Sequence, residues 1–266
     1  FSRHYNKKSQ IIEKIRRIAI SATFYNRDFR QRCKQANLIL CKTEITRKQV
    51  PQKYADKAIL FTDVAADIVN TSRVSQKKNN TIEFITVGHL DAWRGFDLII
   101  EAMAEVMKEN THLHLTIIGD GTDKKRLEEL IKRFKLEETV ALTGKVPMKT
   151  YKIMMDRADV VINAALKEGA VTVSFDCMAM GKPLICLDTT GYTRYFNNEY
   201  AILIPRTGRK EVVQNIKDGI LRLTDSRERE ILGRKAQEVS CKFSWENHGK
   251  EIRDAIVKAY ISYSSK

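Results

Sequence analysis

The sequence lacks the patterns that identify several common classes of enzyme and membrane protein. No apolar run is long enough to cross a bilayer. The five cysteines and five histidines form no Cys-x-x-Cys, His-Glu-x-x-His or other closely spaced ligand set, so we expect no metal. There is no Gly-x-Gly-x-x-Gly, which argues against NAD or FAD, and Gly181-Lys182 is followed by proline where a P-loop has Ser or Thr. No Ser-His-Asp or Cys-His nucleophile set is apparent, and we expect no bound cofactor.

Cysteine is scarce and odd in number, which argues against a disulfide framework. The five residues are widely scattered, and most stand in apolar strand or helix patterns. We expect them to be reduced thiols in the core of a cytoplasmic protein. They are Cys33, Cys41, Cys177, Cys186 and Cys241.

Acidic residues are scarce in the first part of the chain. Residues 1–60 contain 15 Lys and Arg against 4 Asp and Glu, a surplus of 11 within a net charge of +14 for all 266 residues. This surplus favours an anionic partner, such as an anionic membrane leaflet or a lipid-linked acceptor. Nucleic acid is disfavoured because no recognised binding motif accompanies the charge. A solvated face, or a face that meets another part of a longer protein, is the alternative. The chain starts at Phe1 and a helical pattern follows at once, so we expect a fragment.

Apolar periodicity predicts an incomplete α/β unit before a polar linker at residues 73–80. The order is helix, helix, strand, helix, strand, which is the closing portion of a Rossmann-like half with too few strands for a domain. We expect a helix at 9–20, a helix ending near Ala36, a strand at 37–42, a helix at 44–54 and a strand at 57–61.

After the linker, strands and helices alternate regularly and predict a second, complete α/β domain. Its strands are continuously apolar, which favours a parallel sheet covered by helices on both faces. We expect strands at 81–87, 113–118, 140–142, 160–163, 183–187 and 201–204. We expect helices at 95–108, 124–134, 150–157, within 167–183, at 210–223, and from Ser244 toward Tyr260. In such sheets ligands bind beyond the carboxyl ends of the strands.

Residues 167–183, KEGAVTVSFDCMAMGKP, are the most informative stretch of the chain. Glu168 and Asp176 stand eight positions apart, and the segment ends in Gly-Lys-Pro. Gly169 allows close approach of the backbone, and the amides that follow it are a site for phosphate at a helix N-terminus. Asp176 lies one turn beyond Thr172 on the same face, where a hydroxyl-rich group could lie alongside. A helix with merely solvated acids is the alternative.

The stretch resembles the E-x7-E signature of family 4 glycosyltransferases, retaining sugar-nucleotide enzymes of the GT-B fold. The resemblance implies that Glu168 lies near the donor sugar and its anomeric carbon. It implies that Asp176, an acid shorter than the family's usual Glu, hydrogen-bonds the ribose. We expect the donor to contact the backbone of Gly169, Ala170, Val171 and Thr172.

Residues 87–95, VGHLDAWRG, resemble the family's Gly-Arg-Leu-x-x-x-Lys-Gly segment, whose two basic residues bind the donor diphosphate. The match places Gly88 at the glycine, His89 at the arginine and Arg94 at the lysine. Arg94 keeps the charge and can bind phosphate with two donors. His89, with an unperturbed pKa of about 6.5, is only partly charged at neutral pH. Either the diphosphate is held more weakly or another base substitutes.

Two further strand ends resemble nucleotide contacts of the family. Gly119-Asp120-Gly121 is similar to its Gly-x-Gly loop, although alone it predicts only a turn. In the family, the backbone at Lys145 and Val146 would hydrogen-bond the nucleobase. The resemblance then divides the chain into an acceptor-side remnant at 1–72, the linker 73–80, a nucleotide-sugar-binding domain at 81–243 and a crossover helix at 244–266.

The sequence therefore predicts the donor-binding half of a retaining glycosyltransferase, hexosyl or related. Arg94 and Glu168 are the expected catalytic residues. The substrate would be a UDP- or GDP-linked sugar and the acceptor a saccharide or lipid-linked molecule of polysaccharide biosynthesis. We expect a cytoplasmic protein, peripheral at the inner face of the membrane, whose fragment transfers sugar poorly. The alternatives are a sugar-nucleotide epimerase, a non-catalytic subunit with a degraded site, and a basic-surface adaptor.

Overall fold

The computed structural model describes residues 7–67, 81–109, 112–167, 172–189 and 195–264. The described chain forms two compact units. One unit contains the residues up to Ala65 together with those from Lys242 onward, and the other contains Ala66–Cys241. None of the helices in these ranges combines the length and apolar composition that a membrane span requires.

The first unit contains one short parallel strand pair and several helices. Strands β1 and β2 pair in parallel, and Cys33, Cys41, Val50 and Ala58 form a small buried cluster beside them. In the carboxyl-terminal helix, a ring nitrogen of His248 lies 3.1 Å from the carbonyl oxygen of Thr62. The elements are α1 (Lys7–Tyr25), α2 (Arg27–Gln35), β1 (Ile39–Cys41), α3 (Glu44–Arg47), β2 (Ala58–Leu60) and α10 (Trp245–Ser264).

The single helix predicted over residues 44–54 is wrong. Helix α3 ends at Arg47, and a separate 3₁₀ helix spans Gln52–Lys57. Pro51 stands between them with φ −55° and ψ 136°, in an extended conformation. Its ring removes the N–H that an α-helix needs, and it disfavours helical torsions at the preceding residue.

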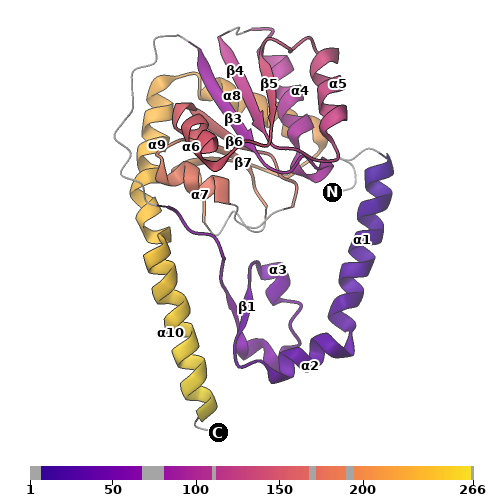
Figure 1. Cartoon of the computed structure of the whole chain (residues 1–266), viewed down its shortest axis with the longest axis vertical. Helices are drawn as coiled ribbons and strands as arrows, with labels where there is room; N and C mark the ends of the chain where they lie inside the picture. The colour runs from indigo at the N-terminus through magenta and orange to yellow at the C-terminus, as the bar shows by residue number, and fades with distance from the viewer. Residues whose placement is uncertain (1–6, 68–80, 110–111, 168–171, 190–194, 265–266) are drawn as a thin grey trace. The chain divides into compact units, whose positions relative to one another are not determined.

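The second unit is a six-stranded parallel sheet in the order β5-β4-β3-β6-β7-β8, which confirms the predicted α/β class (Figure 1). Every residue of β6 and β7 is buried, as expected of strands with helices on both faces. The strands are β3 (Ile82–Val87), β4 (Leu113–Ile118), β5 (Val140–Gly144), β6 (Val160–Asn163), β7 (Leu184–Leu187) and β8 (Ala201–Ile204).

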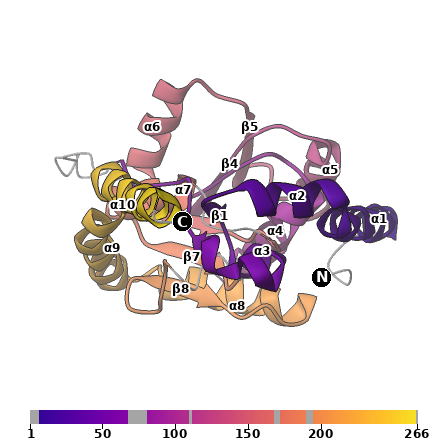
Figure 2. The same cartoon turned by 90° about the horizontal axis from the view of Figure 1, so that it is seen from below.

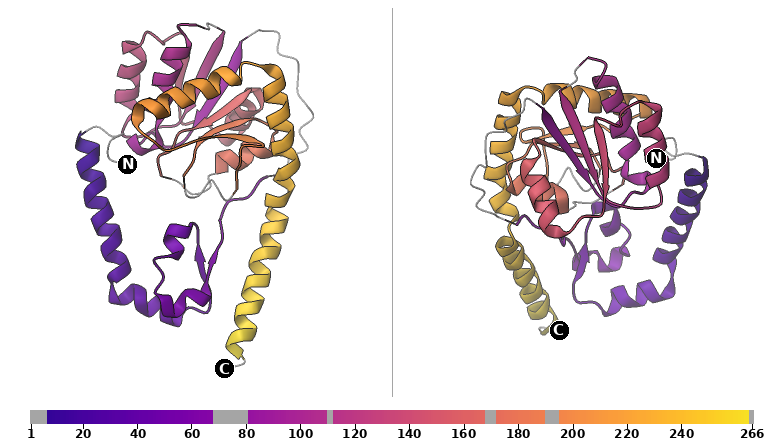
Figure 3. Two further views of the ribbon diagram at one scale, coloured as in Figure 1. Left: turned by 180° about the vertical axis from the view of Figure 1, so that it is seen from behind. Right: turned by 45° about the horizontal axis from the view of Figure 1, so that its top comes forward.

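Helices cover the two faces of this sheet in two groups. Helix α4 (Phe96–Val106) packs against α5 (Lys124–Arg133) and α8 (Arg209–Arg222) on one face. Helix α7 (Thr172–Ala179) packs against α9 (Ser226–Ser240) on the other. Helix α6 (Met148–Arg157) lies beside α7, and its Tyr151 hydroxyl donates to Asp176 of α7 (Figure 1). Figure 2 shows both groups from the end of the sheet, and Figure 3 shows them from two other sides.

Helix α9 is absent from the elements predicted by periodicity, because its apolar residues are sparse. It begins after Asp225, whose side chain accepts a hydrogen bond from the backbone N–H of Arg227. Its Gly233 packs so closely on α7's end that an added Cβ would lie 2.1 Å from the carbonyl oxygen of Gly181. The helix is therefore set by tertiary packing of small residues rather than by a strong apolar stripe.

All five cysteines are free thiols, and four are buried as predicted. Burial raises the pKa of Cys177 and of Cys186, so both are poor nucleophiles. Cys241 is exposed, because it lies in the short 3₁₀ helix between α9 and α10. The prediction of a core position is wrong for this residue.

Candidate functional site

The predicted site residues follow the carboxyl ends of neighbouring strands. Gly88 follows β3, Gly119 follows β4, and Lys145 follows β5. The N–H of Gly88 donates to Ile118 O at 3.0 Å, and the N–H of Gly119 donates to Gly144 O at 3.0 Å. The sheet order reverses between β3 and β6, and such a switch point at the carboxyl edge is where parallel sheets bind ligands.

Gly119 allows the loops after β3 and β4 to approach within backbone contact. Its φ is +147°, and a Cβ there would lie 1.9 Å from the carbonyl oxygen of Gly88. A side chain is excluded at this position by both the torsion and the space. The position is therefore one at which the sequence needs glycine.

Gly95 joins the loop after β3 to the loop after β6, across the switch point. Its φ is +71°, and a Cβ would lie 2.1 Å from the carbonyl oxygen of Ala164. Next to it, the N–H of Leu166 donates to Trp93 O at 2.8 Å. The segment that contains Arg94 is thus fixed against the segment that leads to residue 168.

The half-buried Arg94 side chain folds back over the carboxyl end of β3. A Cβ added to Gly88 would lie 3.8 Å from both Cδ and Cζ of Arg94. The guanidinium carbon also lies 4.3 Å from the centre of the Trp93 ring, a cation–π contact. The structure thus holds a guanidinium at the mouth of the sheet, where a phosphate could bind it.

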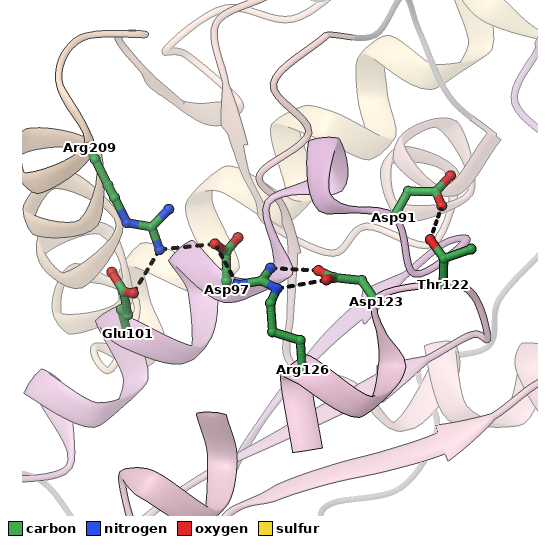
Figure 4. Close-up of polar contacts among 7 residues, drawn as sticks. All are labelled: Asp91, Asp97, Glu101, Thr122, Asp123, Arg126 and Arg209. Carbon is green, nitrogen blue, oxygen red and sulfur yellow. Dashed lines mark hydrogen bonds and ion pairs between the residues drawn. The ribbon is translucent and has the colours of Figure 1, made fainter. Parts of the chain in front are cut away.

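His89 lies differently from Arg94. Its side chain is 54% exposed, and Nδ1 lies 3.3 Å from Oδ2 of Asp91. The other carboxylate oxygen of Asp91 accepts from Thr122 Oγ1 at 3.1 Å (Figure 4). An acidic side chain therefore accompanies the histidine that replaces the expected arginine.

Lys145 and Val146 lie between β5 and α6. The Lys145 residue is exposed and Val146 is half-buried. Among the described residues, no main-chain hydrogen bond joins either of them to another residue.

Four of the predicted residues, Glu168, Gly169, Ala170 and Val171, lie outside the described residues. Thr172, the first residue of α7, is exposed, and Asp176 follows one turn later. Asp176 is half-buried, and its Oδ2 accepts a hydrogen bond of 2.6 Å from the Tyr151 hydroxyl. Tyr151 is in the first turn of α6, where its N–H donates to Pro147 O at 2.9 Å.

Burial raises the pKa of Asp176, and the hydrogen bond from Tyr151 opposes this shift. Asp67 raises the pKa further, and Lys152 lowers it. A partly buried carboxylate whose charge is disfavoured is typical of functional sites.

We expect Asp176→Asn to raise the free energy of unfolding at neutral pH. The folded pKa lies above the unfolded pKa, so the stability that Asp176 contributes is present below the unfolded pKa and is lost as pH rises through the folded pKa. Asparagine never carries the charge, and its amide oxygen still accepts from Tyr151. Urea unfolding at pH 7 and pH 4 should show a gain at pH 7 that shrinks at pH 4. The exposed Asp254→Asn is the control, and a larger gain at pH 4 would refute the expectation.

Five charged side chains link the N-terminal parts of helices α4, α5 and α8 (Figure 4). The Asp97 side chain is only 7% exposed and accepts from Arg209 at 3.0 Å and from Arg126 at 3.4 Å. Arg209 also donates to Glu101 at 2.7 Å, and Arg126 donates to Asp123 at 2.6 Å. The network joins the N-terminal turns of α4, α5 and α8, which all begin at the carboxyl edge of the sheet.

Sequence reasoning missed Tyr151, Lys167 and this charge network. Tyr151 is one turn into α6 and carries no local motif, so only the tertiary contact with Asp176 reveals it. Lys167 directly precedes Glu168, and that adjacency was the available signal. The ammonium nitrogen of Lys167 lies 5.6 Å from the centre of the Trp93 ring.

Residues 67–239 match the family model described as Glycosyl transferases group 1. Among curated proteins, the uncharacterized glycosyltransferase MJ1069 of Methanocaldococcus jannaschii is 26% identical over 185 residues, covering 68% of this chain and 46% of that protein. The chain therefore spans less than half of that relative's length.

Two solved structures share the fold. The pneumococcal O-GlcNAc transferase GtfA, in complex with UDP and GlcNAc, has a TM-score of 0.72 at 16% identity, over 87% of this chain and 47% of that chain. Alr3699/HepE of Anabaena, in complex with UDP, has a TM-score of 0.69 at 15% identity, over 85% of this chain and 65% of that chain. At these identities the likeness shows the fold alone.

Proposed function

Because this chain belongs to the group 1 glycosyl transferase family, we propose that it binds a nucleoside diphosphate sugar at the carboxyl edge of its sheet. Membership confirms the family resemblance predicted from the sequence motifs. The observation on which the proposal rests is the Arg94 guanidinium, held over Gly88 beside the switch point. The chain would be the donor half of a retaining glycosyltransferase.

We propose one role for each part of this edge. Arg94 binds the diphosphate, and the main chain at Lys145 and Val146 binds the base. Asp176 binds the ribose with the oxygen that does not accept from Tyr151. Glu168 lies at the donor sugar, and the backbone of 169–172 contacts the phosphate. These assignments are supported by the placement of the described residues and by the motif spacing.

The chemistry follows from charge at the leaving group. As the bond between the sugar and the diphosphate breaks, negative charge builds on the diphosphate, and a fixed guanidinium stabilises it. Glu168 would orient the sugar or support positive charge on its ring. In this proposal no metal is needed if those groups supply the electrostatic support.

The donor in this proposal is a UDP-linked hexose or related sugar, with GDP as the alternative base. Both structural relatives were solved in complex with UDP, and this supports the choice. The same comparisons give no support to the epimerase alternative.

The acceptor in the proposal is a saccharide or lipid-linked molecule of a cell-envelope or exopolysaccharide pathway. What supports it is the surplus of 11 positive charges in residues 1–60. In helix α1, the exposed Ile11, Ile15 and Ile18 stand among basic residues, as in helices that lie on anionic membranes. A peripheral place at the inner face of the membrane belongs to the same proposal. If the protein did not pellet with anionic vesicles at low salt, the proposed membrane association would be contradicted.

We expect calorimetric titration to detect UDP binding that Arg94→Ala weakens about ten- to hundredfold, the loss for one charge-assisted phosphate contact. Arg133→Ala is the matched control, since Arg133 also stacks on an aromatic ring, 5.0 Å from the centre of Phe134, at the far end of α5. Glu168→Ala should keep UDP affinity and lose the preference among UDP-sugars.

The panel should include GDP and GDP-sugars, so that it identifies the base. No measurable binding of any nucleotide would contradict the proposal and favour a non-catalytic subunit or a basic-surface adaptor. Isomerisation of the donor without an acceptor would instead reveal an epimerase. Robust sugar transfer by this chain alone would contradict the expectation that it acts poorly without further protein.

A further inference from the structure

One guanidinium does not balance the charge of a nucleoside diphosphate, which carries at least two negative charges at neutral pH. His89 is not placed to add a second full charge beside Arg94. It is exposed and lies against the Asp91 carboxylate, which would repel a phosphate. A second cation close to Arg94 would therefore strengthen the binding of a diphosphate beyond what Arg94 and backbone amides supply.

Lys167 lies at the same tryptophan as Arg94. The guanidinium carbon of Arg94 is 4.3 Å from the centre of the Trp93 ring, and the Lys167 ammonium is 5.6 Å from it. The two cations are thus no farther apart than these two distances combined. Like charges held together cost Coulomb energy, and an anion bound to both recovers it.

The backbone that presents Lys167 is fixed on both sides. The N–H of Leu166 donates to Trp93 O at 2.8 Å, and the carbonyl oxygen of Leu166 accepts from Arg206 at 3.2 Å. The contact between Gly95 and Ala164 holds the same two loops together. The contacts between the loops at the switch point therefore position Lys167. Arg206 adds a third positive charge near this segment.

We infer that Lys167 is the second phosphate-binding cation of the donor site, with Trp93 as the platform that spaces it from Arg94. The inference rests on the proposed function and adds a residue to it. It also explains how the site binds a diphosphate with a histidine at position 89. Trp93 contributes by holding both cations against its ring through cation–π contacts.

The test compares three ligands that share a base and differ in phosphate charge: UDP, UMP and uridine. Calorimetry should show that Lys167→Gln weakens UDP about tenfold, as expected for loss of one charge-assisted contact, with a smaller loss for UMP and none for uridine. Lys167→Arg should restore most of the UDP affinity. The dependence of UDP affinity on salt should also become shallower in Lys167→Gln.

Lys132→Gln, an exposed lysine at the far end of α5, is the matched control and should bind all three ligands as the unmodified chain does. Thermal unfolding of each variant checks that the fold is kept. UDP affinity unchanged in Lys167→Gln would overturn the inference and leave the proposed function standing. Equal losses for uridine and UDP would also overturn it, because they would indicate a purely structural role. No UDP binding by the unmodified chain would overturn the proposed function and this inference together.

Discussion

Gly95→Ala is expected to lower the free energy of unfolding of the second unit by about 3–5 kcal/mol, combining a left-handed torsion with a steric clash. Gly95 has φ +71°, where an L-residue costs about 1–2 kcal/mol. Its new Cβ would lie 2.1 Å from the carbonyl oxygen and 2.9 Å from the carbonyl carbon of Ala164. Both atoms belong to the backbone, so the loops after β3 and β6 would have to separate.

Gly144→Ala is the matched control. Gly144 has almost the same torsion, φ +72°, but nothing lies within 4 Å of an added Cβ. We expect this variant to lose only about 1–2 kcal/mol, the cost of the torsion alone. The difference between the two variants isolates the contact between the two loops.

Urea unfolding would be followed by the fluorescence of Trp93 in a Trp245→Phe background, since these are the two tryptophans of the protein. Gly95→Ala should also lose UDP affinity, because it displaces the segment on which Arg94 and Lys167 converge. Equal destabilisation by both alanines would show that the loops do not meet as described.

The strands of the second unit could be predicted closely because their cause is local. Leu113–Ile118 and Val160–Asn163 are apolar runs of strand length, and both appear with the predicted bounds. A strand buried on both faces needs apolar residues throughout, so an uninterrupted apolar run in the sequence directly indicates such a strand. The failures have tertiary or stereochemical causes. Pro51 ends a helical pattern early, and α9 depends on the contact of Gly233 with Gly181.

The site divides in the same way. Arg94 could be predicted as a site residue because Gly88, Arg94 and Gly95 lie within one short segment of the sequence. Lys167 is more than seventy positions away and lies at the same tryptophan as Arg94 because the loops after β3 and β6 meet where the sheet order reverses. Neither the apolar periodicity nor the motifs indicate that these two residues lie near the same tryptophan. Parallel pairing across a crossover brings together residues that no local pattern connects.

The second large effect is expected from Asp97→Ala, which should lower the free energy of unfolding by about 3 kcal/mol, as removal of one partner from a buried ion pair does. Asp97 is 7% exposed, and Arg126 and Arg209 are 34% and 27% exposed. Without Asp97, both guanidinium groups stay partly buried with one carboxylate fewer. Asp97 also lies in the first turn of α4, where its charge is favourable to the helix dipole.

Each arginine keeps another acidic partner, which limits the loss. Arg126 retains Asp123, and Arg209 retains Glu101. A double-mutant cycle of Asp97→Ala with Arg209→Ala therefore measures the link between α4 and α8 directly, as a non-additive stability change. Asp97→Asn should recover part of the loss, since its amide oxygen still accepts hydrogen bonds.

Asp254→Ala removes an acid from an exposed pair with Arg253, at 67% and 69% exposure, and is expected to change stability by less than about 1 kcal/mol. Additivity of Asp97→Ala and Arg209→Ala would contradict a coupled network.

If the network also holds the loops at the carboxyl edge in place, Asp97→Ala should weaken UDP binding at temperatures where the chain stays folded, since Arg94 lies three residues before Asp97. A variant that loses stability but keeps full UDP affinity would show that the network supports the helices without positioning the loops above them.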